Sequence, residues 1–446
     1  MSKIFRFHGG VYPPEEKLAS QAGIQVAPLL EKYTVPLQMH IGAPAKSLVQ
    51  KGQKVLRGQL LAEPGGYVSA AVHSPTSGVI KEYGSCLGVN GTQWPALIIE
   101  SDGEDQNQEP MPPISDWQNT DPKILLKRIE DAGIVGKGGA AFPTHVKLSP
   151  PPDTPIDTLI INGVECEPGL SADHRLMLEN PDQIIEGALI VAHILQAKHI
   201  YLGIEDNKQD TIELFREKTA STGAPQVYSL KVRYPQGAEK HLIYALTKRK
   251  VPRGGLPLNV GCVVQNVASI YAIYDAVVNG KPLYERVTTV TGNPVVNPGN
   301  WLLRIGSSYA DALKLAGGLK EQPAKVISGG PMMGVSVYSL DIPVTKNCAG
   351  LLFLSRSQLS QFQSKACIHC GRCNDVCPMR LTPGMLGIQI ENDRFDLAEA
   401  WNVLDCMECG CCAYICPAHR PLVQHMRRAK TEVIAKRQAA EAKKSS

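Results

Sequence analysis

Cys367-Ile-His-Cys370-Gly-Arg-Cys373-Asn-Asp-Val-Cys377-Pro and Cys406-Met-Glu-Cys409-Gly-Cys-Cys412-Ala-Tyr-Ile-Cys416-Pro repeat one pattern of four cysteines and a proline. The spacing C-x2-C-x2-C-x3-C-P is that of bacterial ferredoxins, in which four thiolates bind a 4Fe–4S cluster. Where two such runs occur, the fourth cysteine of each run binds the other run's cluster. We therefore predict one cluster on Cys367, Cys370, Cys373 and Cys416, and a second on Cys406, Cys409, Cys412 and Cys377.

Two other structures are built from closely spaced cysteines, namely zinc ribbons and disulfide frameworks. A zinc site needs only two cysteine pairs, and it requires neither a third cysteine at this spacing nor a proline after the fourth. Cys411 does not fit the spacing, so we predict that Cys412 is the ligand of that pair. The pattern favours paired clusters, which indicates a carrier of single electrons.

Length and charge narrow the possible classes of protein. The chain has 446 residues, enough for several domains, and its net charge of +4 gives no indication of a nucleic-acid partner. It contains no run of about 18 apolar residues, so we expect no membrane-spanning helix. Residues 426–446 are rich in arginine, lysine and alanine, which predicts a frayed, basic helix. Such a helix is usually a solvated end, and docking on a partner or lipid surface is the alternative.

Residues 1–110 predict a β barrel-sandwich domain. Apolar and polar residues alternate between about residues 35 and 100, with glycines at the turns. The pattern resembles biotinyl and lipoyl carrier domains, which modify a lysine on a central hairpin. The corresponding hairpin here, residues 63–69, has no lysine, so we expect a structural or docking role. An acidic, proline-rich linker follows at about residues 102–116.

The remaining chain predicts three further domains. Residues 117–283 alternate between helical and strand patterns, which indicates a Rossmann-like open α/β sheet with ligands beyond the carboxyl ends of its strands. Residues 284–350 predict an α+β module of β-grasp type, and residues 358–425 a helical twin-cluster domain. We expect helices at 121–131, 205–219, 260–278, 309–315 and 386–404, and strands at 158–162, 199–203, 287–292, 298–301 and 325–331.

A second chemical feature is the glycine run Gly136-Lys137-Gly138-Gly139, which precedes a helix started by Pro143. Such a run lets backbone N–H groups approach a phosphate, although it is neither G-x-G-x-x-G nor a Walker loop and could be only a tight turn. A predicted strand then ends in Asn162-Gly-Val-Glu165-Cys-Glu167. These polar groups could form a simple turn, or they could bind a flavin ring and ribose hydroxyls. Together the two features predict a nucleotide cofactor.

The glycine run with Lys147, followed by Asn162-Gly-Val-Glu-Cys-Glu-Pro-Gly-Leu-Ser-Ala-Asp-His-Arg-Leu-Met177, resembles the C subunit of the Rnf family of membrane-bound NADH:ferredoxin oxidoreductases. The likeness covers nearly the whole chain, with the domains in the same order. The chain is more distantly similar to the FMN- and NADH-binding subunit of respiratory complex I. A cobalamin-reductase relative shares the parts but begins with the flavin domain, so the domain order favours Rnf.

The resemblance implies FMN, NADH (or NAD) and two 4Fe–4S clusters as cofactors. It implies that the partners are the other subunits of an Rnf-type complex, with ferredoxin as an indirect redox partner. Membrane contact and ion translocation would then depend on those subunits, with this chain peripheral on the cytoplasmic side of the bacterial inner membrane. Two alternatives stay open at this point: a soluble reductase for another acceptor such as cobalamin, and a non-catalytic electron-wire subunit.

The resemblance also implies roles for individual residues. The FMN phosphate would be lined by Gly136, Lys137, Gly138 and Gly139 and paired with Lys147. Asn162 and Glu165 would face the isoalloxazine ring, and Gln265 and Asn266, expected to open a helix, would approach the phosphate or ribityl chain.

A different set of residues would bind NADH. Phe142 would stack on the nicotinamide nucleotide, and Glu167 would hold a ribose. Tyr234, Gly237 and Glu239 match a segment of the complex I subunit that has a tyrosine, a glycine and two acidic residues. In this chain Ala238 stands in place of one of the two acidic residues. Because a flavin accepts hydride directly, no catalytic acid or base is expected.

Overall fold

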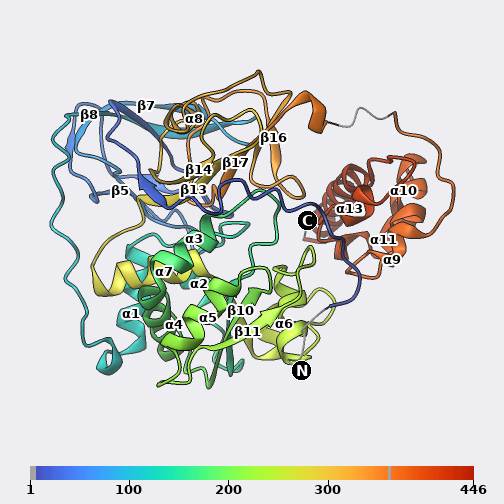
Figure 1. Cartoon of the computed structure of the whole chain (residues 1–446), viewed down its shortest axis with the longest axis horizontal. Helices are drawn as coiled ribbons and strands as arrows, with labels where there is room; N and C mark the ends of the chain where they lie inside the picture. Colours follow the sequence, from blue (N-terminus) through green and yellow to red (C-terminus); the bar gives the residue numbers. More distant parts are fainter. Residues whose placement is uncertain (1–6, 360–362, 446) are drawn as a thin grey trace.

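The computed structural model describes residues 7–359 and 363–445, and Figure 1 shows how their domains are arranged. The barrel-sandwich strands and the β-grasp sheet lie beside each other. The α/β domain lies below them in this view, and the helical cluster domain lies apart at one side. Among the described residues, no helix is both long and apolar enough to cross a membrane.

The N-terminal domain contains two small sheets, in agreement with the predicted sandwich. One has the strand order β2 (Lys32–Pro36), β8 (Gln93–Ser101), β7 (Gly78–Leu87), β4 (Lys54–Val55). The other has the order β3 (Lys46–Ser47), β5 (Leu60–Glu63), β6 (Val72–His73). Tyr33, Val35, Leu61, Ile80 and Ile99 are buried between them and form part of the largest core.

The α/β domain has a four-stranded parallel sheet in the order β11 (Gln226–Leu230), β10 (His199–Glu205), β9 (Thr158–Gly163), β12 (Cys262–Asn266). The chain moves outward from β9 to β11 and then returns to the other side of β9, so the carboxyl ends of β9 and β12 flank a topological switch point. Open α/β sheets bind their ligands at such points. The helices are α1 (Pro122–Asp131), α2 (Thr144–Lys147), α3 (Ala172–Glu179), α4 (Pro181–Leu195), α5 (Gln209–Lys218), α6 (Glu239–Thr247) and α7 (Val267–Val278).

Two predicted helices of this domain are wrong in their extent. Residues 262–266 form strand β12, not the start of a helix, because this β-branched run pairs with β9. Asn266 therefore ends a strand, and its side chain caps α7 by accepting a hydrogen bond from Ala268 N. The helix predicted from residue 205 begins at Gln209 because Glu205 still belongs to β10. The helix predicted at 121–131 is confirmed, with Asp121 as its cap.

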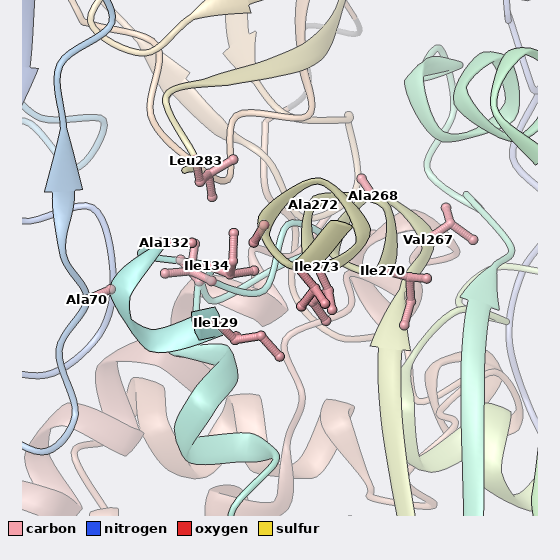
Figure 2. Packing of buried hydrophobic residues seen from close by; sticks show 14 of the residues in the cluster. Ala70, Ile129, Ala132, Ile134, Val267, Ala268, Ile270, Ala272, Ile273 and Leu283 are labelled. Carbon is pink, nitrogen blue, oxygen red and sulfur yellow. The ribbon is translucent and has the colours of Figure 1, made fainter. Parts of the chain in front are cut away.

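The barrel-sandwich and α/β domains share one hydrophobic core, which a few residues of the β-grasp module join. Figure 2 shows Ile129 of α1 and Ile134, which follows α1, near Ile273 of α7. Ala70 of the barrel-sandwich domain and Leu283 lie at the margins of this group. Buried Lys346 adds a polar tie, because its Nζ donates to the carbonyl oxygens of Ala71 (2.5 Å) and Gly133 (2.7 Å). The nucleotide site is therefore built on a frame of three packed domains.

The β-grasp module has a six-stranded sheet in the order β1 (Ile24–Val26), β14 (Gly299–Arg304), β13 (Glu285–Thr291), β17 (Gly350–Leu354), β15 (Lys325–Ser328), β16 (Val335–Val337). Helix α8 (Tyr309–Leu315) covers it, with Tyr309 and Leu313 buried in the same cluster as Trp301 and Leu303 of β14. Strands β1 and β17 extend the sheet beyond the range 284–350 on both sides.

The cluster domain contains α9 (Arg372–Asp375), α10 (Pro383–Glu391), α11 (Phe395–Ala400), α12 (Cys411–Tyr414) and α13 (Leu422–Ser445). The single spacer helix predicted over 386–404 is wrong, because the chain breaks between α10 and α11, where Asp393 has a φ of 55°. The helix predicted from residue 426 is confirmed as part of α13, but its first half is packed and not frayed. Met426, Ala429 and Val433 of α13 are buried with residues of α10 and α11.

Candidate functional site

Two asparagines lie side by side at the switch point of the parallel sheet. Asn162 ends β9 and Asn266 ends β12, and the two are paired in register. The Asn162 side-chain amide donates to the Gly237 carbonyl oxygen (2.8 Å), and the Asn266 amide donates to the Asp173 carboxylate (2.6 Å). The ends of β9 and β12 thus hold two further segments, those of Gly237 and Asp173, at one edge.

The glycine run lies against this edge. A Cβ atom at Gly138 would lie 3.0 Å from the Asn266 side-chain nitrogen, so the loop packs tightly against Asn266. The loop is held by Lys137 N, which donates to Ser269 Oγ (2.9 Å), and by the Gly139 carbonyl, which accepts from Asn347 (3.0 Å). Within residues 7–359 and 363–445, no hydrogen bond takes up the N–H of Gly138 or Gly139, and both residues are exposed. These N–H groups are available to an anion.

Two buried charges lie behind the loop. Burial, followed by the charge of Arg286, lowers the pKa of Lys137 to about 7. Burial, followed by the charge of Glu165, raises the pKa of Asp173 to about 6. Both side chains line a small cavity of about 40 Å³ between α7 and β13. Lys137 therefore contributes its backbone to the loop and its side chain to the interior.

Lys147 and Glu239 form an ion pair of 2.6 Å between the end of α2 and the start of α6. Their side chains are 29% and 38% exposed, so an incoming ligand can reach them. Phe142 is half-buried, and its carbonyl accepts from Gly136 N (2.9 Å), which closes the glycine loop.

The two predicted glutamates each hold a neighbouring segment. The Glu165 carboxylate accepts from the N–H groups of Asp173 (2.7 Å) and His174 (3.2 Å) at the start of α3. The Glu167 carboxylate accepts from Met332 N (3.1 Å) and Met333 N (2.9 Å) of the β-grasp module. Burial raises the pKa of Glu167. Neither glutamate projects freely into solvent.

Several buried polar atoms around this edge have no hydrogen-bond partner among the described residues. They include both side-chain amide atoms of Gln236, the Gln265 nitrogen, and the hydroxyls of Thr144 and Tyr234. Buried polar groups are nearly always paired, so these atoms fit a polar ligand such as a nucleotide. Sequence reasoning did not select Gln236 or Thr144; the only sequence signal for Gln236 is its position within the segment 234–239.

The first predicted cysteine set surrounds an open cavity. Cys367, Cys370, Cys373 and Cys416 line a space of about 230 Å³ that is also lined by Met385 and Arg420. Burial raises the pKa of the Cys373 thiol, and Cys416 and Cys367 also raise it, as expected of neighbouring thiols. Cys370 is exposed, so this set faces outward.

Three of the four cysteines of the second predicted set are buried, and Cys406 is half-buried. Cys377, Cys409 and Cys412 are 7%, 7% and 8% exposed. Burial raises the pKa of Cys406 to about 11, with further contributions from Cys409 and Cys377. The pKa of Cys412 is raised by burial and then by Cys406, Cys409 and Cys377. These mutual effects indicate that the four thiols lie together.

All thirteen cysteines are free thiols, so no described residues form a disulfide framework. Among residues 7–359 and 363–445, no group of three or more His, Cys, Asp or Glu is arranged to hold a metal ion. Thiols spread around a cavity suit a larger group of iron and sulfide atoms.

The buried set lies against the α/β domain. Cys409 and Cys411 form one apolar cluster with Tyr234 and Val11, which Cys166 and Met332 border. The Cys411 thiol is fully buried and directed at the Tyr234 carbonyl oxygen (3.8 Å).

A sheet edge of the kind that binds nucleotides, with one of two cysteine sets packed beside it, is the arrangement of a flavin and iron–sulfur electron-transfer protein. Four family models match in the order of the domains. They are the RnfC barrel sandwich hybrid domain (residues 5–104), the Nuo51 FMN-binding domain (129–275), the SLBB domain (287–336) and the 4Fe-4S dicluster domain (360–417).

The chain belongs to the family of C subunits of ion-translocating ferredoxin:NAD(+) oxidoreductase complexes, as the resemblance indicated. It is 46% identical to the C subunit of the proton-translocating complex of Clostridium ljungdahlii, over 96% of this chain and 93% of that one. It is 40% identical to the C subunit of the Na(+)-translocating complex of Acetobacterium woodii, over 97% and 98%. It is 42% identical to the C subunit of the ion-translocating oxidoreductase complex of Pseudomonas aeruginosa, over 98% and 57%.

Solved structures show a likeness of fold. A chain of the H2-reduced NAD+-reducing [NiFe]-hydrogenase has a TM-score of 0.50 and 20% identity, over 72% of this chain and 67% of that one. The air-oxidized form has a TM-score of 0.47 and 20% identity, over 65% of this chain and 59% of that one.

Proposed function

We propose that this chain passes electrons between NADH and ferredoxin as the peripheral subunit of a membrane-bound complex, on the cytoplasmic side of the bacterial inner membrane. Partner subunits supply the membrane contact and the ion translocation. One observation carries the proposal. The sheet edge proposed to bind the nucleotide contacts the second cysteine set through Tyr234, which packs against Cys409 and Cys411. Its family membership supports the choice of NADH and ferredoxin.

The residues proposed to bind FMN come from segments that meet at the switch point. Unsatisfied N–H groups in the glycine run and the partly exposed ammonium of Lys147, which is paired with Glu239, support binding of the phosphate at this edge. The paired asparagines and the unpartnered amides support binding of the ring and ribityl chain. The proposed FMN set is Gly136, Lys137, Gly138, Gly139, Lys147, Asn162, Glu165, Gln265 and Asn266.

The residues proposed for NADH are Phe142, Glu167, Tyr234, Gly237 and Glu239. Lys147 links Glu239 to the FMN set, and the Asn162 amide links Gly237 to it. Because Glu167 is already bound to two backbone N–H groups of the β-grasp module, a ribose contact would use its remaining lone pairs.

The eight cysteines are proposed to hold two 4Fe–4S clusters, in the crossed sets predicted from spacing. Bound FMN supplies the conversion between two-electron and one-electron transfer, because flavin can exchange both. The protein binds the nucleotide at the edge, excludes water with the apolar residues at Tyr234 and Val11, and keeps the second thiol set buried.

An FMN titration followed by flavin fluorescence tests the nucleotide site. Asn266→Ala removes the amide at the switch point and is expected to raise the FMN Kd by about tenfold, since a buried hydrogen bond is worth roughly 0.5–1.5 kcal/mol. Asn392→Ala, on the exposed end of α10, is the matched control. Equal affinity in both variants would place FMN elsewhere. Recovery of the chain with its partner subunits from a membrane fraction tests the peripheral position.

A further inference from the structure

Residues 7–17 form an extended segment, here called the N-terminal strap, that does not lie within the barrel-sandwich domain. Figure 1 shows this dark-blue segment passing between the α/β domain and the helical cluster domain before it reaches the strands of the barrel. Phe7, Gly9, Gly10 and Val11 are buried there. The strap therefore fills an interface between two domains.

On the α/β side, the strap is bound through the segment that contains Tyr234. Val11 N donates to the Tyr234 carbonyl (2.9 Å), and Tyr234 N donates to the Val11 carbonyl (2.9 Å). The Phe7 ring stacks on His241 with centroids 4.9 Å apart. The Arg233 guanidinium lies over the Phe7 ring (5.6 Å) and donates to the Phe7 carbonyl (3.3 Å).

The strap is also bound to the turn after β9. Lys17 Nζ donates to the carbonyl oxygens of Glu165 (2.9 Å) and Leu170 (2.6 Å). Gly169 N donates to the Glu15 carbonyl (2.7 Å). Both segments that the strap contacts, residues 162–170 and 233–239, carry proposed FMN and NADH residues.

On the cluster side, the strap lies on the backbone of Val376 and Cys377. Gly10 N donates to the Val376 carbonyl (2.8 Å). Gly9 has a φ of +75°, and a Cβ atom there would lie 2.8 Å from the Val376 oxygen and 2.9 Å from the Cys377 oxygen. Only glycine fits this approach without a shift of the strap or of Cys377.

Apart from the apolar cluster around Tyr234 and Cys411, the polar connections described between the cluster domain and the α/β domain are weak. The ion pair of Arg253 with Asp405 (2.6 Å) involves an arginine that is 62% exposed, and exposed pairs contribute little. The Cys411 thiol is a weak donor to Tyr234. Small interfaces between domains permit relative motion unless something restrains it. The strap supplies backbone hydrogen bonds to both domains.

We propose that the N-terminal strap is a positioning element. It holds the second cysteine set (Cys377, Cys406, Cys409 and Cys412) at a fixed place relative to the nucleotide site. This inference rests on the proposed function, because it concerns the separation between the FMN site and that set. Val11 and Gly10 act as neighbouring attachment points, one to each domain. Residues far from both sites in sequence thus determine how efficiently the two sites exchange electrons.

Gly9→Ala tests the inference in the full chain loaded with FMN and iron–sulfur clusters. Alanine is strained at the left-handed φ of residue 9, and its Cβ would press on Cys377. Amide exchange at Gly10, Val11 and Tyr234 is therefore expected to accelerate by about tenfold or more. With NADH, the KM and rate of flavin bleaching should stay the same, while bleaching of the clusters slows by about tenfold or more. Gly52→Ala is the control, because Gly52 has a similar φ of +84° and nothing within 4 Å of its Cβ position.

Arg233→Ala provides a second variant that touches no cysteine and leaves Tyr234 in place. It should change exchange and cluster bleaching in the same direction, with iron content unchanged. The inference is overturned if Arg233→Ala and Gly9→Ala match Gly52→Ala in both measurements. Failure of NADH to bleach the flavin in the parent chain would instead contradict the proposed function. Amide exchange would still test whether the strap holds the two domains together.

Discussion

Glu165→Gln tests whether the predicted flavin residue Glu165 acts through helix α3. In the structure its carboxylate accepts the N–H groups of Asp173 and His174, at 2.7 and 3.2 Å. Its second neighbour is the Lys17 ammonium, 3.8 Å away. Asp173 in turn holds the Asn266 side chain at the switch point. The substitution therefore perturbs the start of α3 and, through Asp173, the Asn266 side chain at the switch point.

The size of the effect follows from these contacts. Glutamine keeps one acceptor oxygen but directs an NH2 group toward the other donor, so one hydrogen bond to a charged acceptor is lost. Such a bond is worth roughly 1.5–3 kcal/mol. Glu165 and Lys17 are only 6% and 11% exposed, so solvent replaces the carboxylate poorly. Opening of the first turn of α3 should become about 10- to 100-fold more frequent.

Amide exchange at Asp173 and His174 measures this opening directly. Glu213→Gln, which alters an exposed residue of α5, is the matched control. We also expect Glu165→Gln to shift the flavin reduction potential or the NADH turnover. Exchange rates equal to those of Glu213→Gln would refute the capping role, and unchanged potential and turnover would remove Glu165 from the flavin environment.

Three further predictions concern the clusters, the domain tie and the phosphate. Cys411→Ser should keep about eight iron atoms per chain while Cys412→Ser loses about four, as two 4Fe–4S clusters require; the reverse result would reassign the ligand. Burial lowers the pKa of Lys346 to about 7, so between pH 7 and about 10 the unfolded chain holds a proton that the folded chain lacks. The free energy of unfolding should then rise with pH by up to about 1.4 kcal/mol per unit, and thermal unfolding of Lys346→Met should lack that rise. Lys147→Met should raise the FMN Kd by about tenfold or more, whereas Lys127→Met, on the exposed face of α1, should not.

The fold class and the order of the domains could be predicted from the sequence, because local pattern determines them. The crossed cysteine sets remain a prediction from spacing. Cysteine spacing is a direct ligand signal, and the alternation around β9 and β10 is a direct strand signal. The failure at residues 262–266 has a physical cause. A short β-branched run followed by an apolar helix has no internal boundary except Asn266, and only pairing with β9 makes the run a strand.

Contacts between distant segments could not be predicted from one sequence. Residues 7–17 show no periodic pattern, so nothing in them indicated an interface between two domains. Likewise, Glu167 carries no sign that it binds the N–H groups of Met332 and Met333, which lie 165 residues or more away along the chain. Gln236 is significant only because burial leaves its side-chain amide without a partner among the described residues.

An anaerobic NADH titration of the chain loaded with FMN and iron–sulfur clusters, followed by visible absorbance, tests the central claim most directly. The proposed function predicts that the flavin band bleaches and that the broad cluster band follows, within this one chain. If FMN and the clusters are bound but NADH bleaches neither band, the chain does not accept electrons from NADH by itself. That result would contradict the path from the sheet edge to the cysteine sets.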